Sequence, residues 1–410
     1  MLSVEEARAK VIEVITARKK PCPLKTETIN FAQEPARALG RILAEQIVAD
    51  RNYPPFNRSI RDGFAVRASD AAEPGAKLRL IGESRAGVPF DGSVGAGECV
   101  RILTGAAVPK GASAVIMQEY AREEGEFVIF EHGTKLGQHY VHAGAEARVG
   151  EVVIPRSTRL GYAELAMAAE VGRVNVTVNR RPRVAILSTG DEVVEVDQTP
   201  GPFQIRNSNT ISLSAQIALA GGEPAPLLNA RDDMGDLRAK IEQGLTADIL
   251  LLSGGMSVGK YDLVEQALRE MDAEFFFDAV ALRPGKPAVF GWCKGKPVFG
   301  LPGNPVSTMV TFELFAVPAI ELLSGYKPQA LPFFRAKLAH AINEKAGVAH
   351  YLPARVSWPN GEPHVELMLW EGSGDIGAVV RGNCFVKVDQ ARLQMDAGEW
   401  ADVLPRRGSF

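Results

Sequence analysis

Apolar residues at the start of the chain recur at every third or fourth position: Val4, Ala7, Val11 and Val14. This spacing places them on one face of a helix. Ser3 and Glu6 form a capping-box pattern, in which each side chain accepts a hydrogen bond from a free amide at the helix N-terminus. The pattern predicts an amphipathic helix of about four turns, ended by Pro21 and Pro23. A second, shorter helical stretch is predicted over residues 35–48.

The pattern changes after residue 48, where short β-like runs alternate with glycine and proline turns. The runs lie at residues 64–66, 78–81, 114–117 and 127–130. Residues 49–142 are therefore predicted to form a small, mainly β domain. Residues 143–180 return to a mixed, partly helical pattern. The β domain is thus predicted to be inserted into an elongated N-terminal domain built from residues 1–48 and 143–180.

Buried strands alternate with helices between residues 181 and 327. Such alternation is typical of a parallel sheet covered by helices on both faces. A long helix is predicted near the end of this stretch, with Asn304 as its cap, Pro305 in its first turn and Gly325 closing it. Residues 328–410 return to short strands with glycine turns and predict a small β barrel or sandwich. The predicted fold class is multidomain α/β plus β, with a central parallel-sheet α/β domain at 181–327.

Composition narrows the function classes. The chain has 410 residues and a net charge of −3, with 46% hydrophobic and 23% charged residues. The near balance of charge argues against a whole-chain binder of nucleic acid or of a membrane surface. No uninterrupted apolar run approaches the ~20 residues of a spanning helix, and no signal peptide is visible. The cysteines, which show no paired spacing, are Cys22, Cys99, Cys293 and Cys384. The sequence therefore predicts a cytoplasmic protein with reduced thiols.

Polar or glycine-rich turns follow the predicted strands of the α/β domain, at residues 188–192, 231–233, 253–259 and 302–305. Ligands of open α/β sheets bind at the carboxyl ends of the strands. Glycine turns that enter helices suit phosphate, whereas the carboxylates of Glu192, Asp232 and Asp262 would repel it unless a divalent cation lies between them. Hard oxygen ligands beside phosphate indicate Mg²⁺. The convergence of these turns predicts a metal-assisted phosphate or nucleotide site.

Simpler explanations exist for each feature alone. A single glycine turn is usually only a turn, and each acidic residue alone is more readily explained as a helix cap. Arg283 and Lys286 lie three residues apart in a loop stiffened by prolines, which suits a small oxyanion, but a solvated basic loop explains them equally well. Asp62 lies in a charged turn that would rank as an ordinary loop. Neither a P-loop motif nor a dinucleotide-binding motif is present.

Six motifs occur in a fixed order along the chain, at residues 62–66, 103–106, 188–192, 253–259, 284–287 and 300–305. Together they closely resemble the molybdopterin molybdenumtransferase (MoeA) family, which includes the E domain of gephyrin. The resemblance covers essentially the whole chain. It implies an inserted β domain, a molybdopterin-binding α/β domain and a C-terminal β barrel. It also implies a homodimer with the site at the subunit interface, so that Asp62 and Thr104 would face the α/β domain of the other chain.

The family implies an enzyme that inserts molybdate into adenylylated molybdopterin, with Mg²⁺-dependent release of AMP, to form the molybdenum cofactor. Functional acidic and hydroxyl positions are matched by Asp62, Thr104, Glu192, Asp232 and Asp262. Of these, Glu192 and Asp262 are predicted to lie nearest the metal. Molybdate-binding positions are matched by Arg283, Lys286 and Ser373. The pterin-nucleotide pocket would be shaped by Ser188, Thr189, Gly190, Gly254, Gly255, Ser257, Pro302, Asn304 and Pro305. The adenylyltransferase of the preceding step and the maturation proteins of molybdoenzymes are further candidate partners.

The sequence departs from the family pattern at several places. Lys260 stands where an acidic residue is frequent, Arg283 replaces a common lysine, and Pro353 occupies a place where arginine is common, with Arg355 nearby. The segment 142–146 lacks the usual arginine and Gly-Glu-Asp pattern. These departures favour, as an alternative, a paralogue that prefers tungstate or has low activity. Two further alternatives are a non-catalytic dimeric scaffold and the adenylyltransferase of the preceding step, which shares the α/β domain. The last normally lacks the N-terminal and barrel domains.

Overall fold

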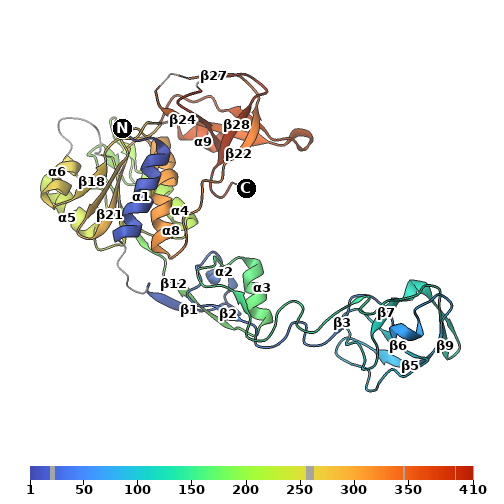
Figure 1. The fold of residues 1–410 in the computed structure, drawn as a ribbon. Helices are drawn as coiled ribbons and strands as arrows, with labels where there is room; N and C mark the ends of the chain where they lie inside the picture. Colours follow the sequence, from blue (N-terminus) through green and yellow to red (C-terminus); the bar gives the residue numbers. More distant parts are fainter. Residues whose placement is uncertain (19–23, 255–262, 345–346, 393, 410) are drawn as a thin grey trace. The chain divides into compact units, whose positions relative to one another are not determined.

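A computed structural model describes residues 1–410 except 19–23, 255–262, 345–346, 393 and 410. The chain folds into two compact units (Figure 1). The first comprises Met1–Glu27, Gly40–Ile42 and Thr177–Phe410, and the second comprises Thr28–Leu39 and Leu43–Val176. The first unit contains an α/β layer structure and a barrel, and the second contains a separate β sheet.

The N-terminal helix forms as its pattern predicts. Helix α1 spans Val4–Arg18 and buries Val4, Ala7, Val11 and Val14. The capping box is confirmed, because the Ser3 amide donates to Glu6 Oε2 at 2.8 Å and the Glu6 amide donates to Ser3 Oγ at 3.1 Å. In Figure 1 this helix lies beside α8 (Val317–Leu323), with which it packs.

The first unit is built around a six-stranded sheet in the order β16-β13-β17-β21-β20-β18. The strands span Glu223–Pro226, Arg183–Ser188, Ile249–Ser253, Lys296–Leu301, Val289–Cys293 and Glu274–Phe277 in that order. The first four are parallel, as predicted. The last two join antiparallel to the edge, so the parallel sheet carries an antiparallel extension that the sequence pattern did not indicate.

Alternate residues of the central strands face two separate cores. Val184 and Ile186 of β13 pack with α1, α4 (Ser208–Leu219) and the long helix that starts at Pro305. Ala185 and Leu187 pack on the opposite face with α5 (Met234–Gly244) and α6 (Leu263–Glu270). Because successive strand side chains point to opposite faces, a fully apolar strand requires helices on both sides of the sheet.

The long helix consists of α7 (Pro305–Thr311), a π-helical turn (Phe312–Ala316) and α8. Pro305 stands in its first turn and Gly325 follows it in the left-handed region at φ +83°. Asn304 occupies the cap position, as predicted, but its side chain makes no capping hydrogen bond there; its Nδ2 donates to Ser373 Oγ. The stretch is long and apolar enough to cross a membrane, but 83% of its most apolar window is buried inside the protein, as in a core helix.

A closed barrel follows the α/β layers. Its strands are β22 (Phe334–Leu338), β24 (Ala349–Ser357), β25 (His364–Leu367), β26 (Cys384–Val388) and β28 (Trp400–Pro405). The circle closes because β24 pairs with both β25 and β26. A short strand, β19 (Leu282–Arg283), leaves the α/β layers and joins β24 in parallel register. The predicted C-terminal barrel is confirmed.

The second unit contains a six-stranded sheet in the order β7-β4-β6-β5-β9-β8. The predicted runs correspond to β4 (Gly63–Val66), β5 (Lys77–Ser84), β7 (Ala114–Met117) and β9 (Phe127–Phe130). The strands β6 (Glu98–Ile102) and β8 (Ala121–Glu124) complete it. Its core contains an edge-to-face contact between Phe64 and Phe130. The predicted inserted β domain therefore forms a sheet with its own core.

The predicted helix over residues 35–48 is wrong. Helix α2 covers only Pro35–Ala38, and β2 (Ile47–Val48) pairs with β11 (Val152–Ile154). Leu39 is already extended, and Gly40 takes a left-handed φ of +74°. Because a helix does not continue through such a conformation, the run ends after a single turn. Helix α3 (Tyr162–Glu170) supplies the helical part of residues 143–180.

The cysteines of the described residues are free thiols. Cys99, Cys293 and Cys384 are all buried. Burial raises the pKa of Cys99 and of Cys384 to about 12. Since the thiolate is the reactive form, neither is suited to act as a nucleophile near neutral pH.

Candidate functional site

Most of the predicted pterin-nucleotide residues line one cavity of about 700 Å³ at the carboxyl ends of the parallel strands. We call it the strand-end cavity. The predicted residues in its wall are Ser188, Thr189, Gly190, Glu192, Asp232, Gly254, Pro302, Asn304 and Pro305. They come from four turns that are far apart in the sequence. The sheet brings them together because parallel strands end at the same edge.

Two glycines allow the strand ends to approach one another closely. Gly254 has a φ of +91°, and a Cβ on it would lie 2.8 Å from the Thr189 carbonyl oxygen. Gly190 has a φ of +128°, and a Cβ there would meet the Glu192 carboxylate at 2.5 Å. Both backbone conformations favour glycine, and at Gly254 the nearby backbone oxygen leaves no room for a side chain either. These turns therefore expose backbone to the cavity without side chains in the way.

The carboxylates in this region have separate roles. Asp233 caps α5, because its Oδ1 accepts a 2.9 Å hydrogen bond from the Asp236 amide. Asp232 is therefore not the cap and lines the cavity instead. Its amide donates to Asp191 Oδ1 at 3.3 Å, which links the turn before α5 to the turn after β13. Glu192 lines the same cavity.

The N-terminus of α4 also reaches the cavity, and the sequence analysis did not identify it. Asn207 caps this helix by accepting a 3.1 Å hydrogen bond from the Thr210 amide. Asn209 Nδ2 donates to Ser253 Oγ at 2.9 Å and to the Gly303 carbonyl at 2.8 Å. It therefore ties α4 to the last residue of β17 and to the turn after β21. The detectable signal was the run Asn-Ser-Asn before an apolar helical pattern, a typical helix start.

The carboxylates in the strand-end cavity suit a magnesium ion only together with a substrate phosphate. Among the described residues, no three His, Cys, Asp or Glu residues form a group that could hold a metal ion. Glu192 and Asp232 nevertheless share one cavity. Mg²⁺ is typically held by one or two carboxylates, with phosphate oxygens and waters completing its shell. The donor set fits that arrangement.

The predicted molybdate-binding residues line a second cavity, of about 640 Å³. We call it the oxyanion cavity. Arg283, Lys286 and Ser373 all contribute to its wall. Arg283 stands on β19, whose pairing with β24 carries the loop to the edge of the barrel. Ser373 lies between β25 and α9 (Ile376–Arg381). The structure thus brings together two cations and a hydroxyl that lie about ninety residues apart in the sequence.

The two cavities adjoin. Pro287, Pro302 and Asn304 line both of them. Asn304 Nδ2 donates a 2.7 Å hydrogen bond to Ser373 Oγ, and the Val306 amide donates to the Ser373 carbonyl at 3.0 Å. An oxyanion in one cavity would therefore lie beside a ligand in the other.

Five further polar or aromatic residues line the oxyanion cavity and were not predicted: Ser307, Glu344, His350, Trp370 and Glu371. The sequence offered little signal for them, since they carry no motif. Pro353 and Arg355, singled out in the sequence, also lie on β24. Neither belongs to the described lining of the cavity, whereas His350 of the same strand does.

Asp62 and Thr104 lie in the second unit and contact one another. Thr104 donates to Asp62 Oδ1 from its amide at 2.6 Å and from its hydroxyl at 2.8 Å. These two hydrogen bonds hold the pKa of Asp62 below its usual range. The carboxylate is exposed. The pair therefore forms a preorganised anionic surface group. Gly255, Ser257 and Asp262, like Lys260, lie outside the described residues.

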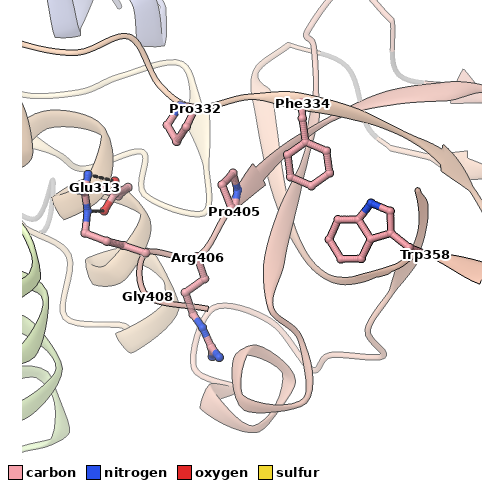
Figure 2. Close-up of a pocket in the computed structure, with 8 residues that line it drawn as sticks. Glu313, Pro332, Phe334, Trp358, Pro405, Arg406 and Gly408 are labelled. Atoms are coloured by element: carbon pink, nitrogen blue, oxygen red, sulfur yellow. Dashed lines mark hydrogen bonds and ion pairs between the residues drawn. The ribbon is translucent and has the colours of Figure 1, made fainter. Parts of the chain in front are cut away.

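A third cavity, of about 380 Å³, lies where the barrel meets the long helix and contains none of the predicted residues (Figure 2). Phe334 and Trp358 stack in its wall, with ring centroids 6.3 Å apart. Arg407 donates to Glu313 Oε1 at 2.6 Å and to Oε2 at 3.2 Å, the ion pair dashed in the figure. Burial alone would lower the pKa of Arg407, but its bonds to Glu313 raise it. The ion pair thus joins the helix to the barrel.

Comparisons with known proteins agree along the whole chain. Residues 2–172 match the MoeA N-terminal region (domain I and II), residues 185–322 match a probable molybdopterin binding domain, and residues 335–405 match the MoeA C-terminal region (domain IV). The molybdopterin molybdenumtransferase of Haemophilus influenzae is 33% identical over 411 residues, covering 99% of this chain and 98% of that protein. The corresponding protein of a Nostoc species is 37% identical over 305 residues, 72% of this chain and 70% of that protein.

A solved structure of the molybdopterin biosynthesis MoeA protein of Pyrococcus horikoshii matches 99% of this chain and 100% of its own, with a TM-score of 0.80 and 26% identity. A second structure of that protein gives a TM-score of 0.76 and 30% identity, over 100% of both chains. The match extends through the α/β layers and the barrel that form both cavities. The chain therefore belongs to the molybdopterin molybdenumtransferase (MoeA) family and is an enzyme of molybdenum cofactor biosynthesis.

Proposed function

We propose that this enzyme inserts molybdate into adenylylated molybdopterin and releases AMP in a Mg²⁺-dependent reaction. One observation carries the proposal: the strand-end cavity and the oxyanion cavity share Pro287, Pro302 and Asn304. A reaction between a pterin nucleotide and an oxyanion needs two such compartments in contact. Holding both reactants side by side converts an encounter between molecules into a reaction within one complex.

In this proposal the strand-end cavity binds the adenylylated pterin. The N-terminal amides of α4, near Ser208 and Asn209, offer donors and a partial positive charge to the phosphoanhydride. The glycine turns at Gly190 and Gly254 let the nucleotide approach the backbone. Glu192, with Asp262 and Asp232, would hold Mg²⁺ beside the phosphates. When bound, the ion would supply positive charge that stabilises the leaving phosphate.

The oxyanion cavity binds molybdate in this proposal. Arg283 and Lys286 provide charge, and the Ser373 hydroxyl can donate a further hydrogen bond. Arg283 is a planar donor and Lys286 a point charge, so together they suit a tetrahedral anion without selecting strongly between oxyanions of the same charge. Whether molybdate or tungstate is the better substrate is an outcome of the test below.

The test is AMP release from adenylylated molybdopterin by the purified protein, with and without molybdate and Mg²⁺, and with tungstate in place of molybdate. Release that needs both ions and is lost in Asp262→Ala supports the transferase and its metal site. A variant at Asp272, an aspartate that neither cavity contains, serves as the matched control. A folded protein that binds the nucleotide but releases no AMP with either oxyanion would favour the scaffold alternative.

We infer a homodimer in the cytoplasm, with Asp62 and Thr104 completing the site of the partner chain. The family resemblance supports this arrangement. An experiment that mixes two variant proteins tests whether the two chains share a site. If each site draws Asp62 from one chain and Glu192 from the other, Asp62→Ala and Glu192→Gln proteins, each with reduced AMP release at a limiting Mg²⁺ concentration, will regain release at that concentration when mixed and reassembled. If both residues serve the same chain's site, mixing will restore nothing. The adenylyltransferase of the preceding step and maturation proteins of molybdoenzymes are the proposed further partners.

A further inference from the structure

A buried histidine stands in the wall of the oxyanion cavity. His350 is 1% exposed and lies on β24. In the parallel pairing of β19 with β24, it is the register partner of Arg283. It is therefore next to the cation proposed to bind the oxyanion. A histidine is rarely placed in such a site for packing alone, because its imidazole must find polar partners when buried.

A carboxylate of the same cavity lies close to this imidazole, although His350 Nδ1 makes no hydrogen bond with the described residues. His350 Nδ1 lies 3.1 Å from Glu344 Oε2, and the Glu344 side chain is 26% exposed. Glu344 also lines the oxyanion cavity. A carboxylate in that position repels a dianion unless its charge is neutralised, and a protonated imidazole at this distance neutralises it.

The charge balance of the cavity depends on this imidazole. The other ionisable residues in the described lining are Arg283, Lys286, Glu344 and Glu371. Among the described lining residues, two cations therefore face two carboxylates, and this set carries a net positive charge only when His350 is protonated. Imidazole is the side chain whose charge ordinarily changes between about pH 5 and 8. The charge state of this imidazole therefore decides whether the described lining is neutral or positive.

Charged groups on the next strand do not alter this balance. His350 is the register partner of Val388 on β26. The flanking Lys387 and Asp389 form an ion pair with each other at 2.9 Å, and Lys387 also bonds Glu5 of α1 at 2.8 Å. Their charges are compensated locally. Glu344, at 3.1 Å from His350 Nδ1, is the lining carboxylate on which protonation of His350 would act.

We propose that His350 and Glu344 form a proton-controlled element of the oxyanion cavity. With the imidazole protonated, Glu344 is neutralised and the oxyanion binds. With the imidazole neutral, the Glu344 charge faces the cavity and binding weakens. His350 is a positioning residue here, since it acts through Glu344. The inference rests on the proposed role of this cavity in oxyanion binding.

The experiment is calorimetric titration of the full-length protein with molybdate alone between about pH 6 and 8, the range over which an imidazole titrates. Wild-type affinity should fall by roughly tenfold across that range, which corresponds to about 1.4 kcal/mol. Glu344→Gln should bind tightly at both ends and show a flat profile. His350→Gln should bind weakly throughout, also with a flat profile. His340→Gln is the matched control, because His340 is a barrel histidine 3.8 Å from a carboxylate, Glu366, outside the cavity.

The outcomes separate this inference from the proposed function. A Glu344→Gln protein that retains the wild-type pH profile overturns the role of the pair, even if His350→Gln proves too unstable to measure. A wild type that releases AMP with molybdate but binds it equally across the pH range overturns the inference and leaves the transferase standing. A wild type that binds molybdate with the expected profile but releases no AMP supports the pair and overturns the transferase.

Discussion

Asn304 donates a 2.7 Å hydrogen bond to Ser373 across the boundary between the α/β layers and the barrel. The two residues lie 69 positions apart in the sequence, and each lines the oxyanion cavity. The bond orients the Ser373 hydroxyl, because its oxygen accepts from Asn304 and its proton stays available to a ligand.

Ser373→Ala should weaken molybdate binding without changing the fold. A hydrogen bond to a charged group contributes about 1.5–3 kcal/mol, so we expect the dissociation constant for molybdate to rise roughly tenfold or more. The affinity for the adenylylated pterin should change little. Titration with each ligand separately measures both effects. Ser357→Ala, on the exposed face of β24, is the control, and equal losses for both ligands would contradict the assignment.

Glu192→Gln should raise the Mg²⁺ concentration needed for half-maximal AMP release. The substitution removes a charged oxygen ligand while keeping the size of the side chain. Loss of groups that support a metal typically costs about 10–100-fold in metal affinity or activity, so a shift of at least about tenfold is expected. Glu195→Gln, three residues further along and outside the described cavity lining, should match the wild type. An unchanged Mg²⁺ dependence in Glu192→Gln would remove this residue from the metal site.

Thr104→Val should raise the pKa of Asp62, because it deletes the hydroxyl that donates a hydrogen bond to the carboxylate. The hydrogen bond from the backbone amide of residue 104 remains. The folded-state pKa of Asp62 is lowered. The ionised carboxylate of Asp62 therefore stabilises the folded protein above its unfolded-state pKa, and this stabilisation is lost as the pH falls through its folded-state pKa. Carbon-13 NMR titration of the Asp62 carboxyl measures the shift directly. The acidic limb of the pH–rate profile should move to higher pH. A titration midpoint that does not move would show that the hydroxyl does not stabilise the ionised form.

Asn209→Ala should destabilise the strand-end cavity. Its amide bonds both Ser253 Oγ and the Gly303 carbonyl, so truncation leaves two partners unsatisfied. We expect a loss of about 1–2 kcal/mol in the free energy of unfolding, together with a larger loss of AMP release. The free energy of unfolding in urea and the rate of AMP release are measured on the same protein preparation. Ser212→Ala, which removes a hydrogen bond within α4 itself, should affect stability alone.

Arg407→Met should destabilise the junction of barrel and helix by roughly 2–3 kcal/mol, because Glu313 would lose its charged partner in a mostly buried position. The Glu313 side chain is only 12% exposed. The double variant Glu313→Gln, Arg407→Met should recover much of the loss, since it leaves no unpaired charge. Thermal unfolding of the two single variants and the double variant provides the comparison. Molybdate affinity should be unchanged in all of them, because neither residue lines the oxyanion cavity.

The pattern of apolar and polar residues predicted correctly those helices and strands that depend on residues close together in the sequence. The capping box depends on contacts between Ser3 and Glu6, which are three residues apart. The central strands were recognisable because nearly all their residues are apolar and buried. The helix predicted over residues 35–48 failed because composition does not show that the chain takes a left-handed turn at Gly40. The antiparallel strands β20 and β18 were missed because strand direction depends on the connection and not on the strand residues.

The sequence by itself determined which turns carry glycine, carboxylate and basic groups, and motif order was enough to indicate the family. Only the tertiary structure shows that Arg283 leaves the α/β layers and pairs with His350 of the barrel. The same is true of the hydrogen bond from Asn304 to Ser373. The tertiary structure also decided that Glu344 and His350 share the oxyanion cavity. These contacts could not be predicted from the sequence because they join residues far apart in the chain. Strand register and the closure of the barrel bring those residues together. No local spacing encodes those distances.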